Sequence, residues 1–100
     1  MTTILEHFNR LTPTEAELLA WLIEEAGEVI QAVGKIQRHG FESKGYDNRG
    51  KLATELGQLK LVINTLCDHS VIDTADITQA YISKVKELLK TPNLLHHTTV

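Results

Sequence analysis

Three glutamates fall within five consecutive positions, Glu24, Glu25 and Glu28. Residues three and four apart share one side of a helix, so in a helix these carboxylates would project toward each other. Like charges at such spacings cost a helix about 0.2–0.5 kcal/mol per pair, and a cation would offset that cost. The spacing therefore favours a site for a hard divalent metal ion, with a solvated acidic stripe as the plainer alternative.

A second acidic element follows later in the chain, where Glu55 precedes Gln58 by three residues beside an apolar seam. If the two segments are facing helices, their acidic groups oppose each other. Mg²⁺ prefers oxygen ligands and keeps several waters, so such a site, open on one side to phosphates, suits it. The set holds no thiolate or imidazole, which argues against zinc, and no Glu-x-x-His pair, which argues against a di-iron centre.

Polar and basic residues follow the first acidic group along the same predicted helix. Gln31, Lys35 and Arg38 come one to three turns after Glu28. Cations at these places could hold phosphate oxygens next to a metal ion. The alternative is that they only keep the helix surface solvated.

The first long helix is predicted to begin at Thr12 and to run to about Arg38. Thr12, Pro13 and Glu15 combine a capping hydroxyl, a proline suited to the first turn and a capping-box acid. Apolar residues then recur at helical spacing. They are Leu18, Leu22, Ala26, Val29, Val33 and Ile36, and the stripe is widened by Leu19, Ile23 and Ile30. The width of the stripe predicts two buried faces.

The remaining elements follow from the same patterns. Residues 3–11 are amphipathic and predict a short N-terminal helix, and the glycine-rich, polar segment 39–50 predicts a loop. A second helix is expected from about Asn48 to Asp68, with an apolar seam like that of a helical bundle. A third, capped by Asp73 or Thr74, should end near Lys90. Its expected inward side chains are Ile77, Tyr81, Val85 and Leu88. Residues 91–100 are expected to be a frayed tail.

Composition restricts the class of protein. A chain of 100 residues with 42% apolar content suits one small domain, residues 1–100, of the all-α class. The net charge of −3 argues against a nucleic-acid-binding surface. Cys67 is the single cysteine, so no intrachain disulfide can form, and a cytoplasmic location is expected. No signal peptide or membrane-spanning run is visible, so no membrane partner is expected.

Two stretches of the sequence together resemble the MazG-like all-α nucleoside triphosphate pyrophosphohydrolases. They are EEAGEVIQAVGKIQRHG and NRGKLATELGQLKLVINTL, and the resemblance covers roughly residues 18–66. The family carries E-E-x-x-E on one helix and E-x-x-D on the next. Glu24, Glu25, Glu28 and Glu55 match these motifs, whereas Gln58 stands where the family usually has an aspartate.

The resemblance implies Mg²⁺-dependent cleavage of a nucleoside triphosphate between its α and β phosphates, giving the monophosphate and pyrophosphate, with Mn²⁺ as a substitute ion. It implies a catalytic role for Glu25 or Glu24 in orienting the attacking water. The implied metal ligands are Glu25, Glu28, Glu55 and Gln58, and the implied substrate-binding residues are Lys35, Arg38, Asn48 and Lys51.

The resemblance also implies a homodimer or a dimer of dimers, in which oligomerisation completes an antiparallel bundle of three main helices plus the short N-terminal one. Two other hypotheses stay open. The neutral amide of Gln58 motivates the first, a nucleotide-binding or regulatory module with weakened catalysis. The second is a purely structural helical oligomerisation domain.

Overall fold

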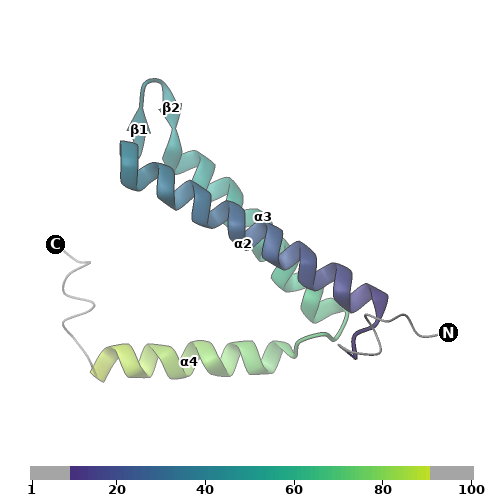
Figure 1. The fold of residues 1–100 in the computed structure, drawn as a ribbon. Helices are drawn as coiled ribbons and strands as arrows, with labels where there is room; N and C mark the ends of the chain where they lie inside the picture. Colours follow the sequence, from purple (N-terminus) through teal and green to yellow (C-terminus); the bar gives the residue numbers. More distant parts are fainter. Residues whose placement is uncertain (1–9, 91–100) are drawn as a thin grey trace.

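The computed structural model describes residues 10–90, which form three helices and a small hairpin (Figure 1). In chain order the elements are α2 (Pro13–His39), β1 (Glu42–Ser43), β2 (Tyr46–Asp47), α3 (Asn48–Asp68) and α4 (Thr74–Lys90). The predicted all-α class is confirmed. None of the described helices combines the length and apolar character that crossing a membrane requires. The N-terminal helix expected at residues 3–11 lies outside the described residues except for Arg10 and Leu11, which are not helical. The tail expected at residues 91–100 lies wholly outside them.

Helix α2 begins where its capping residues predict. The Thr12 hydroxyl accepts a hydrogen bond from the Glu15 backbone N–H at 3.1 Å, and the Glu15 carboxylate accepts one from the Thr12 N–H at 2.9 Å. Pro13 occupies the first turn, where it needs no hydrogen-bond donor. At the other end Gly40, at φ 85°, donates its N–H to the Ile36 carbonyl and ends the helix.

The segment predicted as a loop, residues 39–50, holds a β-hairpin, so that prediction was wrong in part. Glu42 pairs with Asp47 and Ser43 with Tyr46, antiparallel. Lys44 and Gly45 both have positive φ, 52° and 82°, which is the backbone that two-residue hairpin turns need. Helix α3 then starts inside the same segment, because the Asp47 carboxylate accepts a hydrogen bond from the Gly50 N–H at 2.8 Å.

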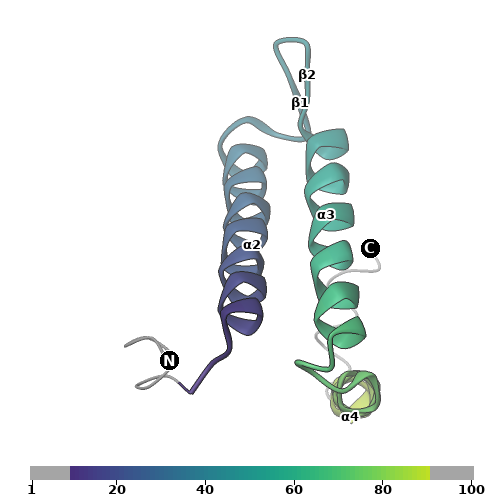
Figure 2. The same ribbon diagram turned by 90° about the vertical axis from the view of Figure 1, so that its right-hand side faces the viewer.

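Helices α2 and α3 run antiparallel and side by side from the hairpin (Figure 2). The bounds predicted for α3 are confirmed. Ala32 is buried apart from the other apolar residues, whereas the hydrophobic core cluster is small and lies away from the hairpin, toward the start of α2 and the end of α3. The cluster consists of Leu18, Val62 and Leu66, with Leu19, Trp21, Leu22 and Val71 packed against it.

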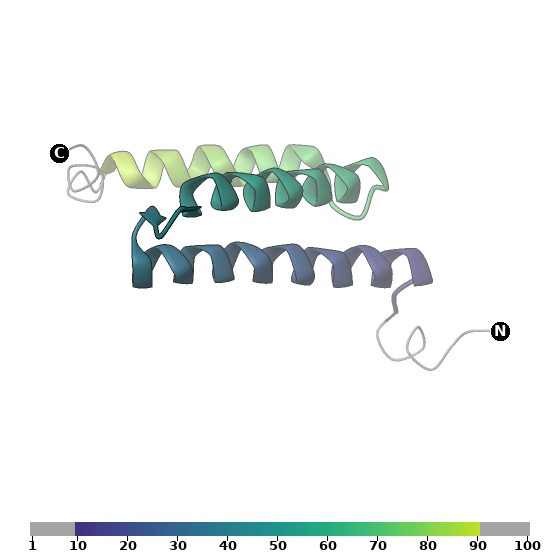
Figure 3. The same cartoon turned by 90° about the horizontal axis from the view of Figure 1, so that it is seen from above.

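Helix α4 diverges from this pair in the view of Figure 1, although it overlaps α3 when seen from above in Figure 3, and it buries none of its residues. The predicted inward face is therefore wrong for the single chain: Tyr81 is 71% exposed, and only Leu88 is half-buried. The second apolar face predicted for α2 is also uncovered, since Ile23 and Ile30 are 74% and 71% exposed. Amphipathic spacing identifies an apolar face but not the surface that covers it.

We predict that Thr12→Ala lowers the free energy of unfolding by about 1 kcal/mol, because it removes the side-chain half of the capping box. Urea unfolding followed by circular dichroism measures this loss. The control is Thr14→Ala, which changes an exposed residue of the same first turn. Equal effects from the two substitutions would contradict a capping role for Thr12.

Candidate metal centre

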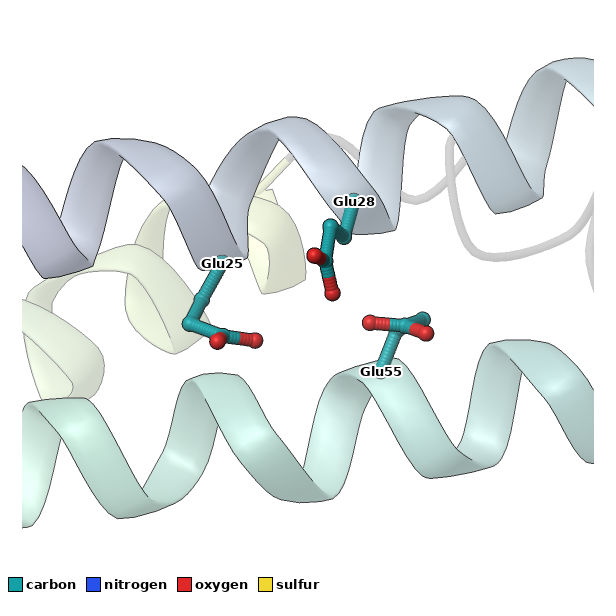
Figure 4. Close-up of side chains that lie close together, drawn as sticks. All are labelled: Glu25, Glu28 and Glu55. Atoms are coloured by element: carbon teal, nitrogen blue, oxygen red, sulfur yellow. The ribbon is translucent and has the colours of Figure 1, made fainter.

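Three carboxylates meet between the two packed helices. Glu25 and Glu28 come from α2 and Glu55 comes from α3, and their side chains point toward one another (Figure 4). One carboxylate oxygen from each residue lies within 4.8 Å of the others. Glu25 is 9% exposed, Glu55 is 3% exposed and Glu28 is half-buried. The antiparallel pair thus brings acid against acid, as the sequence predicts.

Each of the two buried glutamates has one oxygen held by the protein and one left without a partner. The Trp21 indole N–H donates to Glu25 Oε1 at 3.2 Å, and Lys51 Nζ pairs with Glu55 Oε1 at 2.9 Å. The Oε2 atoms of Glu25 and Glu55 are buried and form no hydrogen bond. Burying a charged oxygen without a partner is costly, so this arrangement fits an added cation. The donor set, carboxylate oxygens alone, fits a hard divalent ion.

Two of the three carboxylates, Glu28 and Glu55, shift each other's pKa. Hydrogen bonding to Glu55, and then the charge of Glu55, raise the pKa of Glu28. The pKa of Glu55 is lowered, first by its hydrogen bond from Lys51 and then by hydrogen bonding with Glu28. Lys51 in turn has its pKa raised by Glu55. Glu28 is therefore the member of this pair that takes up a proton first, and a proton there partly neutralises the cluster.

A pocket of about 230 Å³ opens directly beside the carboxylates. Its walls include Glu28 and Glu55 together with two lysines, Lys35 and Lys51. Ala32, a small buried side chain, lies at the same wall. Negative ligands and positive side chains thus share one opening, which is the combination that a metal-bound phosphate requires.

A second pocket, of about 410 Å³, lies at the hairpin end of the helix pair. Lys35 lines both pockets, so they adjoin. The full lining of the second pocket is Lys35, Arg38, His39, Ser43, Lys44, Tyr46 and Asn48. The Asn48 amide donates to the Gly40 carbonyl at 3.0 Å and ties the end of α2 to the start of α3. The lining is rich in cations, which suits an anionic ligand.

Two of the predicted site residues belong neither to the carboxylate cluster nor to the two adjoining pockets. Glu24 is exposed and is not one of the three clustered carboxylates. Gln58 follows Glu55 by one turn with an exposed side chain, and it lines neither pocket. The sequence patterns do not predict a place for Lys44 among the phosphate-binding residues or for Trp21 at the metal centre. The Lys44-Gly45 pair, a turn-forming sequence between residues that can pair as strands, is the signal that could have revealed the hairpin.

Comparison with known protein families shows which family this chain belongs to. A model of the MazG nucleotide pyrophosphohydrolase domain matches residues 13–91. The chain belongs to the MazG family. The match extends beyond the stretch of the sequence resemblance and includes α4. No curated protein and no solved structure matches the chain.

The raised pKa of Glu28 predicts that the free energy of unfolding of the metal-free protein depends on pH. Because folding raises its pKa above the ordinary value of 4.5, Glu28 contributes stability below that pH and loses it as pH rises through the folded-state pKa. We predict that Glu28→Gln removes this loss, so that the metal-free variant is more stable than the wild type at pH 7 and the two converge below pH 4.5. Urea unfolding in a chelator across this range tests it.

Glu17→Gln is the matched control, because Glu17 is an exposed acid on the same helix and is not one of the clustered carboxylates. It should leave the pH profile as in the wild type. A Glu28→Gln profile parallel to that of the wild type would show that the carboxylates do not interact as described.

Proposed function

We propose that this chain is a metal-dependent nucleotide pyrophosphohydrolase that converts a nucleoside or deoxynucleoside triphosphate to the monophosphate and pyrophosphate. Mg²⁺ is the proposed ion and Mn²⁺ a substitute. The observation that supports this most is the pair of buried, unpartnered oxygens of Glu25 and Glu55, which converge with Glu28 beside a lysine-lined pocket. Family membership supplies the reaction class.

Glu25, Glu28 and Glu55 would hold the ion. When bound, a divalent ion polarises phosphoryl oxygens and lowers the pKa of a coordinated water. We assign the orientation of the attacking water to Glu25 rather than to Glu24, because Glu25 lies in the cluster whereas Glu24 is exposed. Glu24 then adds negative charge nearby, which favours the cation and raises the pKa of Glu28 slightly.

The phosphates would extend from the cluster toward the hairpin. Lys51 and Lys35 line the pocket beside the carboxylates, and Lys35 also lines the hairpin pocket with Arg38 and Lys44. Within residues 10–90, neither Lys35, Arg38 nor Lys44 forms an ion pair with a carboxylate, so their charges are available to a substrate. Asn48 would contribute by holding the wall of the hairpin pocket in place through its hydrogen bond to the Gly40 carbonyl. Phosphoryl transfer needs mainly such positioning and charge neutralisation.

We also propose that the chain functions as a homodimer or a dimer of dimers in the cytoplasm, acting on nucleotides and on neither nucleic acid nor membranes. The uncovered apolar face of α4 and the exposed Ile23 and Ile30 of α2 support self-association, because a second copy could bury them. The net charge of −3 disfavours nucleic acid as a partner.

A second candidate function is nucleotide binding with weak or no turnover. It is favoured by Gln58, which replaces the charged aspartate usual in the family with a neutral amide. Gln58 would act as a metal ligand through its carbonyl oxygen or through a water. Under this alternative the protein binds triphosphates in the presence of Mg²⁺ without releasing pyrophosphate.

The products distinguish the two candidates. We predict that the purified protein with Mg²⁺ and a panel of triphosphates yields equal amounts of monophosphate and pyrophosphate, measured by ion-exchange chromatography. Glu28→Gln should reduce turnover at least a hundredfold without changing the helical circular dichroism signal, because it removes a ligand charge while conserving shape. Glu17→Gln should retain full activity. Orthophosphate as the product, or wild-type turnover in Glu28→Gln, would contradict the proposal.

A further inference from the structure

We propose that Trp21 is a positioning residue that fixes the carboxylate of Glu25 for metal binding. This inference rests on the proposed metal centre. Trp21 stands one turn before Glu25 on α2, and its indole N–H donates to Glu25 Oε1 at 3.2 Å. An indole has this single donor. Its one polar contact is therefore made with a proposed ligand.

The indole is itself held by the hydrophobic core. Trp21 is half-buried and packs against the cluster of Leu18, Val62 and Leu66. Neither of the two pockets lined by Lys35 includes Trp21 in its wall. These contacts favour a structural link from the core to the carboxylates over a role in stacking on a nucleotide base.

The hydrogen bond selects which oxygen of Glu25 is free. A glutamate side chain rotates about three bonds, and a donor at Oε1 restricts that rotation and leaves Oε2 buried without a partner. Glu55 has the same arrangement, since Lys51 holds its Oε1 and leaves its Oε2 unpartnered. Both buried glutamates thus offer one oxygen while a neighbour one turn earlier on the same helix holds the other. Donors of this kind typically change metal affinity or activity by 10–100-fold.

The chain allows a test at the level of one atom because Trp21 is its single tryptophan. Biosynthetic replacement of tryptophan by benzothienylalanine exchanges the indole N–H for sulfur and conserves the ring shape. Trp21→Phe is the genetic counterpart, which also removes the donor but leaves a smaller ring. Mn²⁺ binding to the nucleotide-free protein is measured by calorimetry, with Glu28→Gln as the variant that identifies the site.

We expect both changes to weaken Mn²⁺ binding by about tenfold relative to the wild type. The metal-free benzothienylalanine protein should keep the helical circular dichroism signal of the wild type, because the shape of the ring is conserved. Its thermal midpoint should fall, because Glu25 Oε1 loses its hydrogen-bond donor. In the wild type, Mn²⁺ should also quench the tryptophan emission, because the indole contacts a ligand of the ion, and Glu28→Gln should prevent the quenching.

Three results would overturn the inference. Unchanged Mn²⁺ affinity in both proteins would show that the donor does not matter. Weaker binding in Trp21→Phe with unchanged binding in the benzothienylalanine protein would show that only the packing of the ring matters. If the wild type bound no Mn²⁺, both the proposed metal centre and this inference would be wrong. If the wild type binds Mn²⁺ and Glu28→Gln abolishes that binding, the metal centre is supported. The first two results would then remove only the role of Trp21.

Discussion

Two glutamates buried in the contact between α2 and α3 are the constraint on which this structure depends. Glu25 and Glu55 have one oxygen each without a hydrogen-bond partner. Within residues 10–90 they lie in an interface whose hydrophobic cluster has three buried members. Uncompensated buried charge opposes folding, and a small core leaves little stability to offset it. A bound cation would turn the unfavourable contribution of these carboxylates to folding into a favourable one. The contact between α2 and α3 would then stabilise the fold only when the metal ion is bound.

The other elements determine where those carboxylates lie. The hairpin turn at Lys44 and Gly45, and the caps on either side of it at Gly40 and Asp47, set the antiparallel register that places Glu55 opposite Glu28. The same hairpin contributes Lys44 to the cationic pocket, so one local structure sets the register and lines the pocket. The core at the other end of the pair packs against Trp21, whose indole reaches Glu25.

Features with a local cause could be predicted from the sequence. The start of α2 follows from the Thr12 capping box, and the facing acids follow from helical spacing on two segments joined by a short connection. Features that depend on a distant partner could not. Spacing predicts that the apolar face of α4 lies inward, but nothing in the described chain covers it. The Trp21 contact depends on a rotamer that spacing does not determine. The position of Gln58 in the family motif predicts a ligand role, and that role stays a prediction.

The position of a bound metal ion would show directly whether the carboxylates of Glu25, Glu28 and Glu55 form a metal centre. Crystals of the protein soaked in Mn²⁺ and measured at the manganese absorption edge would show anomalous density at each ion. We expect a peak between α2 and α3 within coordination distance of Glu25, Glu28 and Glu55. An ion bound elsewhere, with these three carboxylates still paired only with Trp21, Lys51 and each other, would contradict it.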